Sequence, residues 1–62
     1  MQKFNPKKQI KHARQGKGWS ARKVAEKADV SHTTIHNIER GQNASIDILR
    51  KVYQALNLDF PF

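Results

Sequence analysis

The chain has 62 residues, and its 12 Lys and Arg against five Asp and Glu leave a net charge of +7. It contains no cysteine, which excludes disulfide scaffolds, thiolate zinc sites and cysteine nucleophiles. The longest apolar runs are two or three residues, so we expect one small cytoplasmic domain with neither a membrane span nor a secretory segment.

A first helix is predicted near the N-terminal end of the chain. Asn5 followed by Pro6 is a typical N-cap and first-turn pair, because the missing N–H of proline costs nothing at that position. The helix is expected to end at Gly16 or Gly18, since glycine suits the left-handed residue that closes a helix. Most of its residues are polar, as expected of an outer helix, and those predicted to face inward are Ile10 and Ala13.

A second helix follows the N-cap candidate Ser20 and covers residues 21–28. One stripe of this helix is apolar and is expected to face the core: Val24, Ala25 and Ala28. Trp19, just before it, is predicted to pack in the core rather than to stack on a base. Asp29 is the expected turn residue, because aspartate tolerates positive φ better than most non-glycine residues do.

A third helix is predicted over residues 32–40, with Ser31 as its N-cap and Gly41 as its stop. Its candidates for burial are Val30, Ile35 and Ile38. The turn of residues 28–31 that joins it to the second helix has the length that crosses two helices at a steep angle. The outward side of the third helix is left without a role in the core. It carries short or flat hydrogen-bonding side chains that can reach base edges in a major groove: Ser31, His32, Thr33, His36 and Asn37.

A fourth helix is predicted after the N-cap candidate Ser45. Apolar residues follow at helical spacing and define a broad apolar face: Ile46, Leu49, Val52, Tyr53 and Leu56. The remaining residues 58–62 alternate between apolar and polar as far as Phe60, and Pro61 prevents a continuing helix. Two arrangements of this tail are open. It forms a short strand that pairs with a second copy, or Phe60 and Phe62 fold back onto the first and fourth helices.

Short strings at fixed spacing run through most of the chain: Ile10 to Arg14, Gly18-Trp19-Ser20, Val24 to Lys27, Val30-Ser31, Thr34-Ile35, Ile38 to Gly41 and Leu49 to Leu58. Together they resemble the helix-turn-helix domain of the Cro and phage-repressor superfamily, the XRE family. The resemblance implies an all-α fold in which residues 1–62 form a single DNA-binding domain. It would be a small lambda-repressor-like bundle of four to five helices, with or without a short C-terminal strand.

The resemblance also implies roles for particular side chains. On the third helix, which would be the recognition helix, the residues expected to contact bases are His32, Thr33, His36 and Asn37. The residues expected to contact phosphates lie at the start of the second helix and around both ends of the third: Ser20, Arg22, Lys23, Ser31, Thr34, Arg40, Gln42 and Asn43. Arg14 and Glu39 look like the family's interior ion pair, which is structural.

The chain departs from the family pattern at two positions. Ala21 stands where the family usually has glutamine, which removes one phosphate contact and makes Arg22 the candidate to replace it. Asp29 stands where the turn usually has glycine, so we expect Asp29 in the left-handed conformation at a small strain cost.

Basic residues are concentrated in the first half of the chain. Residues 1–27 hold nine Lys and Arg and one Glu, which gives +8, whereas residues 28–62 hold three basic and four acidic residues, which gives −1. This distribution is typical of a surface that faces phosphates. Together with the resemblance, it predicts a sequence-specific double-stranded DNA-binding repressor that reads a pseudo-palindromic operator as a homodimer, without a cofactor.

Three other interpretations concern metal binding, catalysis and a protein partner. His32 and His36 have the spacing of a two-histidine metal site, but no third ligand stands nearby in the sequence, so no metal is expected. No Ser–His–acid set or paired carboxylate is apparent, and we do not expect an enzyme. The alternative function is that of a HipB-like antitoxin, which would bind a toxin protein and repress its own operon with the same helix-turn-helix.

Overall fold

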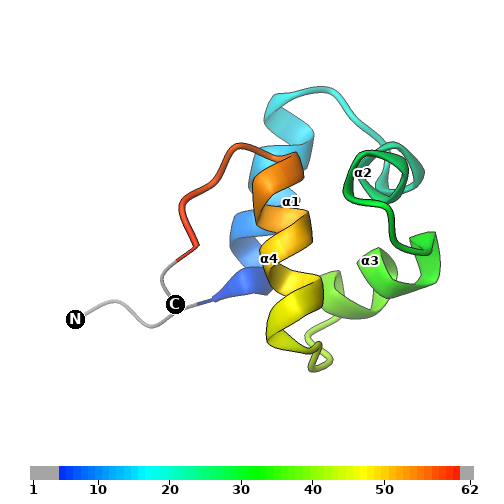
Figure 1. Ribbon diagram of the computed structural model, residues 1–62. Helices are drawn as coiled ribbons and strands as arrows, with labels where there is room; N and C mark the ends of the chain where they lie inside the picture. The colour runs from blue at the N-terminus through cyan, green and yellow to red at the C-terminus, as the bar shows by residue number, and fades with distance from the viewer. Residues whose placement is uncertain (1–4, 61–62) are drawn as a thin grey trace.

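The computed structural model describes residues 5–60, and in this range it contains four α-helices and no strand (Figure 1). The helices are α1 (Pro6–Gly16), α2 (Ala21–Ala28), α3 (His32–Glu39) and α4 (Ile46–Ala55). This arrangement confirms the predicted all-α bundle. The third helix is one residue shorter than predicted, because Arg40 is its C-cap. Among these helices, none is long and apolar enough to cross a membrane.

Each helix begins at the N-cap that the sequence predicts. A side-chain oxygen just before the helix accepts a hydrogen bond from the N–H three residues later, which satisfies one of the free donors of the first turn. The four bonds are Lys8 N to Asn5 Oδ1 at 3.3 Å, Lys23 N to Ser20 Oγ at 3.1 Å, Thr34 N to Ser31 Oγ at 3.3 Å and Ile48 N to Ser45 Oγ at 3.2 Å. Local side-chain chemistry therefore determines where every helix starts.

All four helices also end in the same way: a single residue after the helix adopts the left-handed backbone conformation. These residues are Gly18 (φ 70°), Asp29 (φ 59°), Gly41 (φ 94°) and Asn57 (φ 58°). The residue after each of them donates its N–H to the carbonyl oxygen five positions back: Trp19 to Arg14 at 3.0 Å, Val30 to Ala25 at 3.0 Å, Gln42 to Asn37 at 2.9 Å and Leu58 to Tyr53 at 2.8 Å. This closure satisfies carbonyls that the helix leaves free. The predicted left-handed conformation of Asp29 is confirmed.

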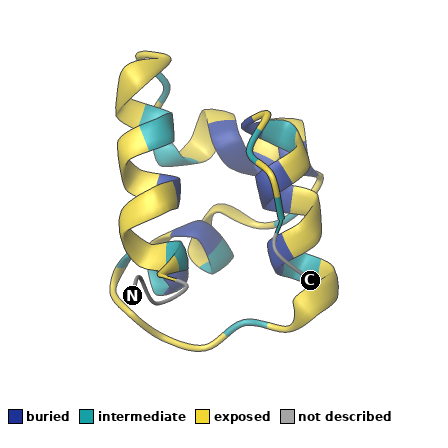
Figure 2. Ribbon diagram, turned by 90° about the vertical axis from the view of Figure 1, so that its left-hand side faces the viewer, coloured by how far each residue is buried: buried dark blue, intermediate teal, exposed yellow. Residues whose placement is uncertain are grey.

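The core lies where α2 crosses α3 and where this pair packs against α1 and α4, which run side by side in Figure 1. Within residues 5–60, ten side chains are buried: Ile10, Val24, Ala25, Ala28, Ile35, Ile38, Leu49, Val52, Tyr53 and Leu56. All of them belong to the predicted apolar stripes. Figure 2 shows that α1 is exposed along most of its length, and its one buried residue is Ile10. Trp19 is half-buried and packs against the core, as predicted.

Ile46 is a correction to the predicted core. The sequence places it on the apolar face of the fourth helix, but 53 % of its surface is exposed. It is the first residue of α4 and lies almost a full turn before the buried Leu49, so its side chain extends past the edge of the core.

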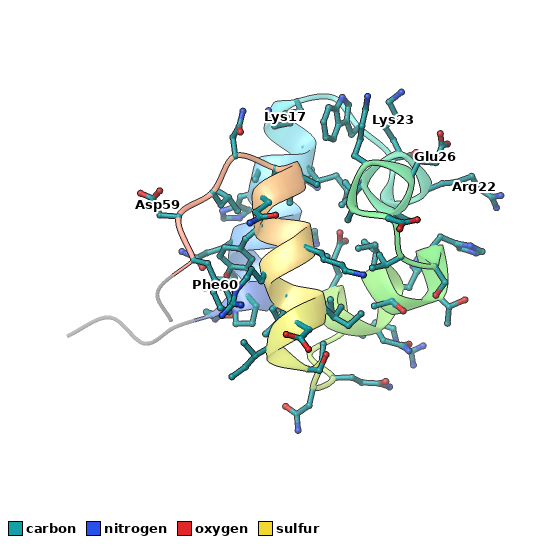
Figure 3. All side chains as sticks on the ribbon, viewed as in Figure 1. Lys17, Arg22, Lys23, Glu26, Asp59 and Phe60 are labelled. Carbon is teal, nitrogen blue, oxygen red and sulfur yellow. The ribbon has the colours of Figure 1, made fainter. Side chains whose placement is uncertain are left out.

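The C-terminal tail folds back against α4 in the part that the structure describes (Figure 3). The ring of Phe60 packs edge-on against that of Tyr53, with centroids 5.2 Å apart and planes at 75°. The guanidinium carbon of Arg50 lies 5.8 Å from the centroid of the Phe60 ring. For Phe60 the structure therefore has the folded-back arrangement, and residues 58–60 contain no strand. Phe62, which shared this expectation, lies outside the described residues.

Candidate nucleic-acid interface

The candidate interface is built on the crossing of α2 and α3. The connection between them is three residues long, and Asp29 opens it in the left-handed conformation. Ala25 and Ala28 are 4 % and 5 % exposed, and their small side chains let α3 approach α2 closely. Val30 is half-buried against the same cluster. The position of α3 on the surface is thus held by packing beneath it.

The two sides of α3 differ sharply in burial. Ile35 is 0 % exposed and Ile38 2 % exposed, so one side of the helix belongs to the core. Three of the predicted base-contacting residues, His32, Thr33 and His36, are exposed on the surface. The fourth, Asn37, is half-buried. The helix therefore presents uncharged hydrogen-bonding groups outward and keeps its aliphatic groups inward.

The two histidines of α3 lie against each other. Their ring centroids are 5.9 Å apart with planes at 77°, an edge-to-face arrangement. In residues 5–60 no group of three or more His, Cys, Asp or Glu side chains is placed to hold a metal ion.

The side chains predicted to contact phosphates fall into two groups in the structure. The hydroxyls of Ser20 and Ser31 cap α2 and α3, and Ser31 Oγ also lies 2.9 Å from Thr34 Oγ1. The others are long or amide side chains that are exposed: Arg22, Lys23, Arg40, Gln42 and Asn43. Figure 3 shows Arg22 projecting from α2 away from the bundle. Exposed basic groups therefore stand at the start of α2 and at the end of α3.

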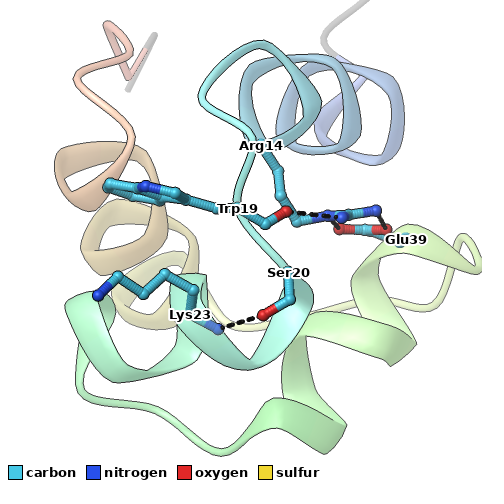
Figure 4. A network of polar contacts seen from close by, with 5 residues as sticks. All are labelled: Arg14, Trp19, Ser20, Lys23 and Glu39. Atoms are coloured by element: carbon cyan, nitrogen blue, oxygen red, sulfur yellow. Dashed lines mark hydrogen bonds and ion pairs between the residues drawn. The ribbon is translucent and has the colours of Figure 1, made fainter.

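Arg14 and Glu39 form the expected ion pair and join α1 to the end of α3 (Figure 4). Arg14 Nε lies 2.7 Å from Glu39 Oε2, and Arg14 Nη2 lies 3.0 Å from Oε1, so the contact is bidentate. Arg14 Nη1 also donates to the carbonyl oxygen of Trp19 at 3.0 Å. The two side chains are only 18 % and 13 % exposed, which suits a structural bond between elements.

Two contacts between distant parts of the chain are absent from the predictions made from the sequence. The hydroxyl of Tyr53 donates a hydrogen bond to Gln9 Oε1, which links α4 to α1. Burial raises the pKa of Tyr53 above its ordinary value of 10.0. Lys7 lies over Gly41, with its Cδ and Nζ 3.7 and 4.0 Å from the position that a Cβ on Gly41 would occupy. Caps and apolar spacing carry no signal for either contact, because both depend on how the helices approach each other.

The sequence that forms this arrangement matches a known protein family. A family model described as helix-turn-helix matches residues 10–62, which include α2, α3, α4 and every buried core residue named above. The chain therefore belongs to the helix-turn-helix family of the XRE and Cro type. Proteins of this class are DNA-binding transcription regulators. Comparison with curated proteins and with solved structures gave no match.

Proposed function

We propose that this protein is a transcriptional repressor that binds a specific double-stranded DNA sequence as a homodimer. The observation that carries the proposal is the division of α3, whose core side is fully buried while its other side is exposed and uncharged. A rigidly seated helix that presents hydrogen-bonding side chains is suited to the major groove, where each base pair offers a distinct pattern of donors and acceptors.

We assign the contacts with DNA phosphates and the recognition of the base sequence to different side chains. Arg22, Lys23 and Arg40 neutralise phosphates and supply affinity for any duplex. Ser20, Ser31, Thr34, Gln42 and Asn43 complete the backbone contacts. The choice of sequence falls to His32, Thr33, His36 and Asn37, since these side chains have the types and positions that can contact base edges.

A homodimer follows from the geometry of such operators. Two copies related by a twofold axis would place their recognition helices in successive major grooves, about 34 Å apart, on a pseudo-palindromic site. A second half-site adds affinity without a new kind of contact. A dimer of this kind represses by occupying its operator.

The direct test is selection of binding sites from random DNA, followed by a salt titration with the selected site. We expect an enriched motif with twofold symmetry and an affinity that falls steeply as salt increases. Enrichment of no motif would contradict sequence-specific binding. A motif without twofold symmetry would contradict binding as a homodimer.

Two alanine variants test the division of roles. His36→Ala is expected to weaken binding to the operator by about 1–3 kcal/mol and to have little effect on random DNA, because it removes a base contact. Arg22→Ala is expected to weaken binding to both DNAs alike, because it removes a phosphate contact. Titration of each variant with operator and random duplexes measures both effects. If Arg22→Ala changes base preference and His36→Ala does not, the assignment of the groove-facing residues is wrong.

The alternative is an antitoxin that also binds DNA, and the short chain with its apolar tail suits it. In the described part of the tail, the ring of Phe60 packs against that of Tyr53. Inspection of the adjacent reading frame separates the two candidates, because an antitoxin is encoded beside its toxin.

A further inference from the structure

The start of α1 and the loop that follows α3 meet at the surface, although they are more than 30 positions apart in the chain (Figure 2). Between them lies a cavity of about 470 Å³. Ile38 and Leu49 contribute apolar surface to it, and its polar lining includes Lys7, Gln42 and Asn43. Two of these three polar residues are already assigned to phosphate contacts.

Lys7 is the charged residue of this group, and its position is defined by contact with the loop. Its Cδ and Nζ lie 3.7 and 4.0 Å from the place where a Cβ on Gly41 would be. Gly41 has a φ of 94°, so the glycine that closes α3 also presents bare backbone to the lysine. Lys7 therefore lies against the loop and lines the same cavity as Gln42 and Asn43.

Apart from Lys7, there is little positive charge beside this cavity. The nearest basic residue along the loop is Arg40, while Gln42 and Asn43 are neutral donors. A phosphate bound by the amides of Gln42 and Asn43 would therefore have no positively charged partner there unless Lys7 of α1 supplied one. Lysine provides a compact charge with three donors, which suits a phosphate oxygen of variable position.

We propose that Lys7, on α1, is a further phosphate-binding residue of the DNA interface and completes the contact made by Gln42 and Asn43. The inference rests on the proposed function and extends it from the helix-turn-helix pair to the first helix. One flank of the recognition helix is then held by Arg22 and Lys23 from α2, and the other by Arg40 together with Lys7 from α1.

The test is a salt titration of DNA binding for Lys7→Gln, with Lys8→Gln as the matched control. Both variants lose one positive charge from an exposed residue of α1, but Lys8 lies outside the cavity. For Lys7→Gln, the slope of log affinity against log salt is expected to fall in magnitude by about 0.9. The affinity lost between about 50 and 200 mM salt then shrinks by about 3.5-fold, equally for operator and random DNA. Lys7→Arg should retain the wild-type slope.

Three outcomes overturn the inference, and they are distinguishable. Equal slopes for Lys7→Gln and Lys8→Gln, with a reduced slope for Arg22→Gln, would reject Lys7 alone and leave the proposed function standing. A Lys7→Gln effect confined to the operator would mean that Lys7 reads sequence and does not bind phosphate. Absence of DNA binding by the wild-type chain would reject the proposed function together with this inference. Thermal denaturation of each variant confirms that the fold is intact.

Discussion

Tyr53 combines a structural and a titratable role in one side chain. It is 0 % exposed in the middle of the core, and its hydroxyl is bonded to Gln9 on α1. Burial disfavours the phenolate, so the pKa of Tyr53 is raised above 10.0. As the pH rises past 10.0, Tyr53 therefore loses its proton in the unfolded chain before it does so in the folded chain. The stability linked to this residue is therefore complete below about pH 10 and is lost as the pH rises through the folded-state pKa.

Tyr53→Phe is expected to remove part of the loss of stability that begins as the pH rises above about 10. At neutral pH the variant should be less stable by about 0.5–1.5 kcal/mol, because the bond to Gln9 is removed. Urea unfolding of both proteins across this pH range measures the difference. A difference that stays constant with pH would contradict the assigned role of the phenol.

At the scale of helices, the common closure determines how the elements are joined. Gly18, Asp29, Gly41 and Asn57 each turn the chain sharply in one residue, so the connections stay short. Asp29 is the least suitable of the four in physical terms. A left-handed L-residue is strained, and a carboxylate at the C-terminal end of α2 opposes the helix dipole.

Asp29→Gly is therefore expected to raise the free energy of unfolding by about 0.5–1 kcal/mol, since it relieves strain and removes the unfavourable charge. Asp29→Ala removes the same charge but keeps the strained backbone, so it should be less stable than Asp29→Gly by about 1 kcal/mol. Denaturant unfolding of the two variants gives both values. Equal stability of the glycine and alanine variants would show that backbone strain at this turn is negligible.

The helix ends and most of the core could be predicted from the sequence because they depend on local chemistry. A serine before a helix, a glycine after it and apolar residues at helical spacing act within a few positions of each other. Ile46 was misplaced because its spacing matches the core although the helix begins beyond the edge of the core. The contacts of Lys7 with Gly41 and of Tyr53 with Gln9 could not be predicted, since they arise from the docking of α1 on other elements.

At the scale of the whole molecule, the core is small and the charge is high. The described part of the chain buries ten side chains, and the net charge is +7, so a binding partner is expected to add to the stability of the domain. Ile46 is an exposed large aliphatic residue at the start of α4, directly after the loop that carries Gln42 and Asn43. A second copy that covered it would bury apolar surface that the single chain leaves in water.

Light scattering should give the wild-type protein a mass near twice the 7.2 kDa of one chain. Ile46→Lys should shift this mass toward that of one chain, because a charge would be buried in the interface. Gln54→Lys, which adds the same charge to an exposed site on the same helix, should remain dimeric. A dimer that survives Ile46→Lys would place the interface elsewhere. A wild-type chain that is monomeric both alone and on operator DNA would contradict the homodimer.

The division of α3 into a buried and an exposed side also bears on how the protein can acquire new targets. His32, Thr33 and His36 are exposed, whereas the residues that seat the helix lie beneath them. If these three side chains contact bases, as proposed, changes at their positions would alter what the helix recognises and leave the packing of the core untouched. The operator preference can therefore diverge between descendants, or be redesigned, without compensating changes in the core.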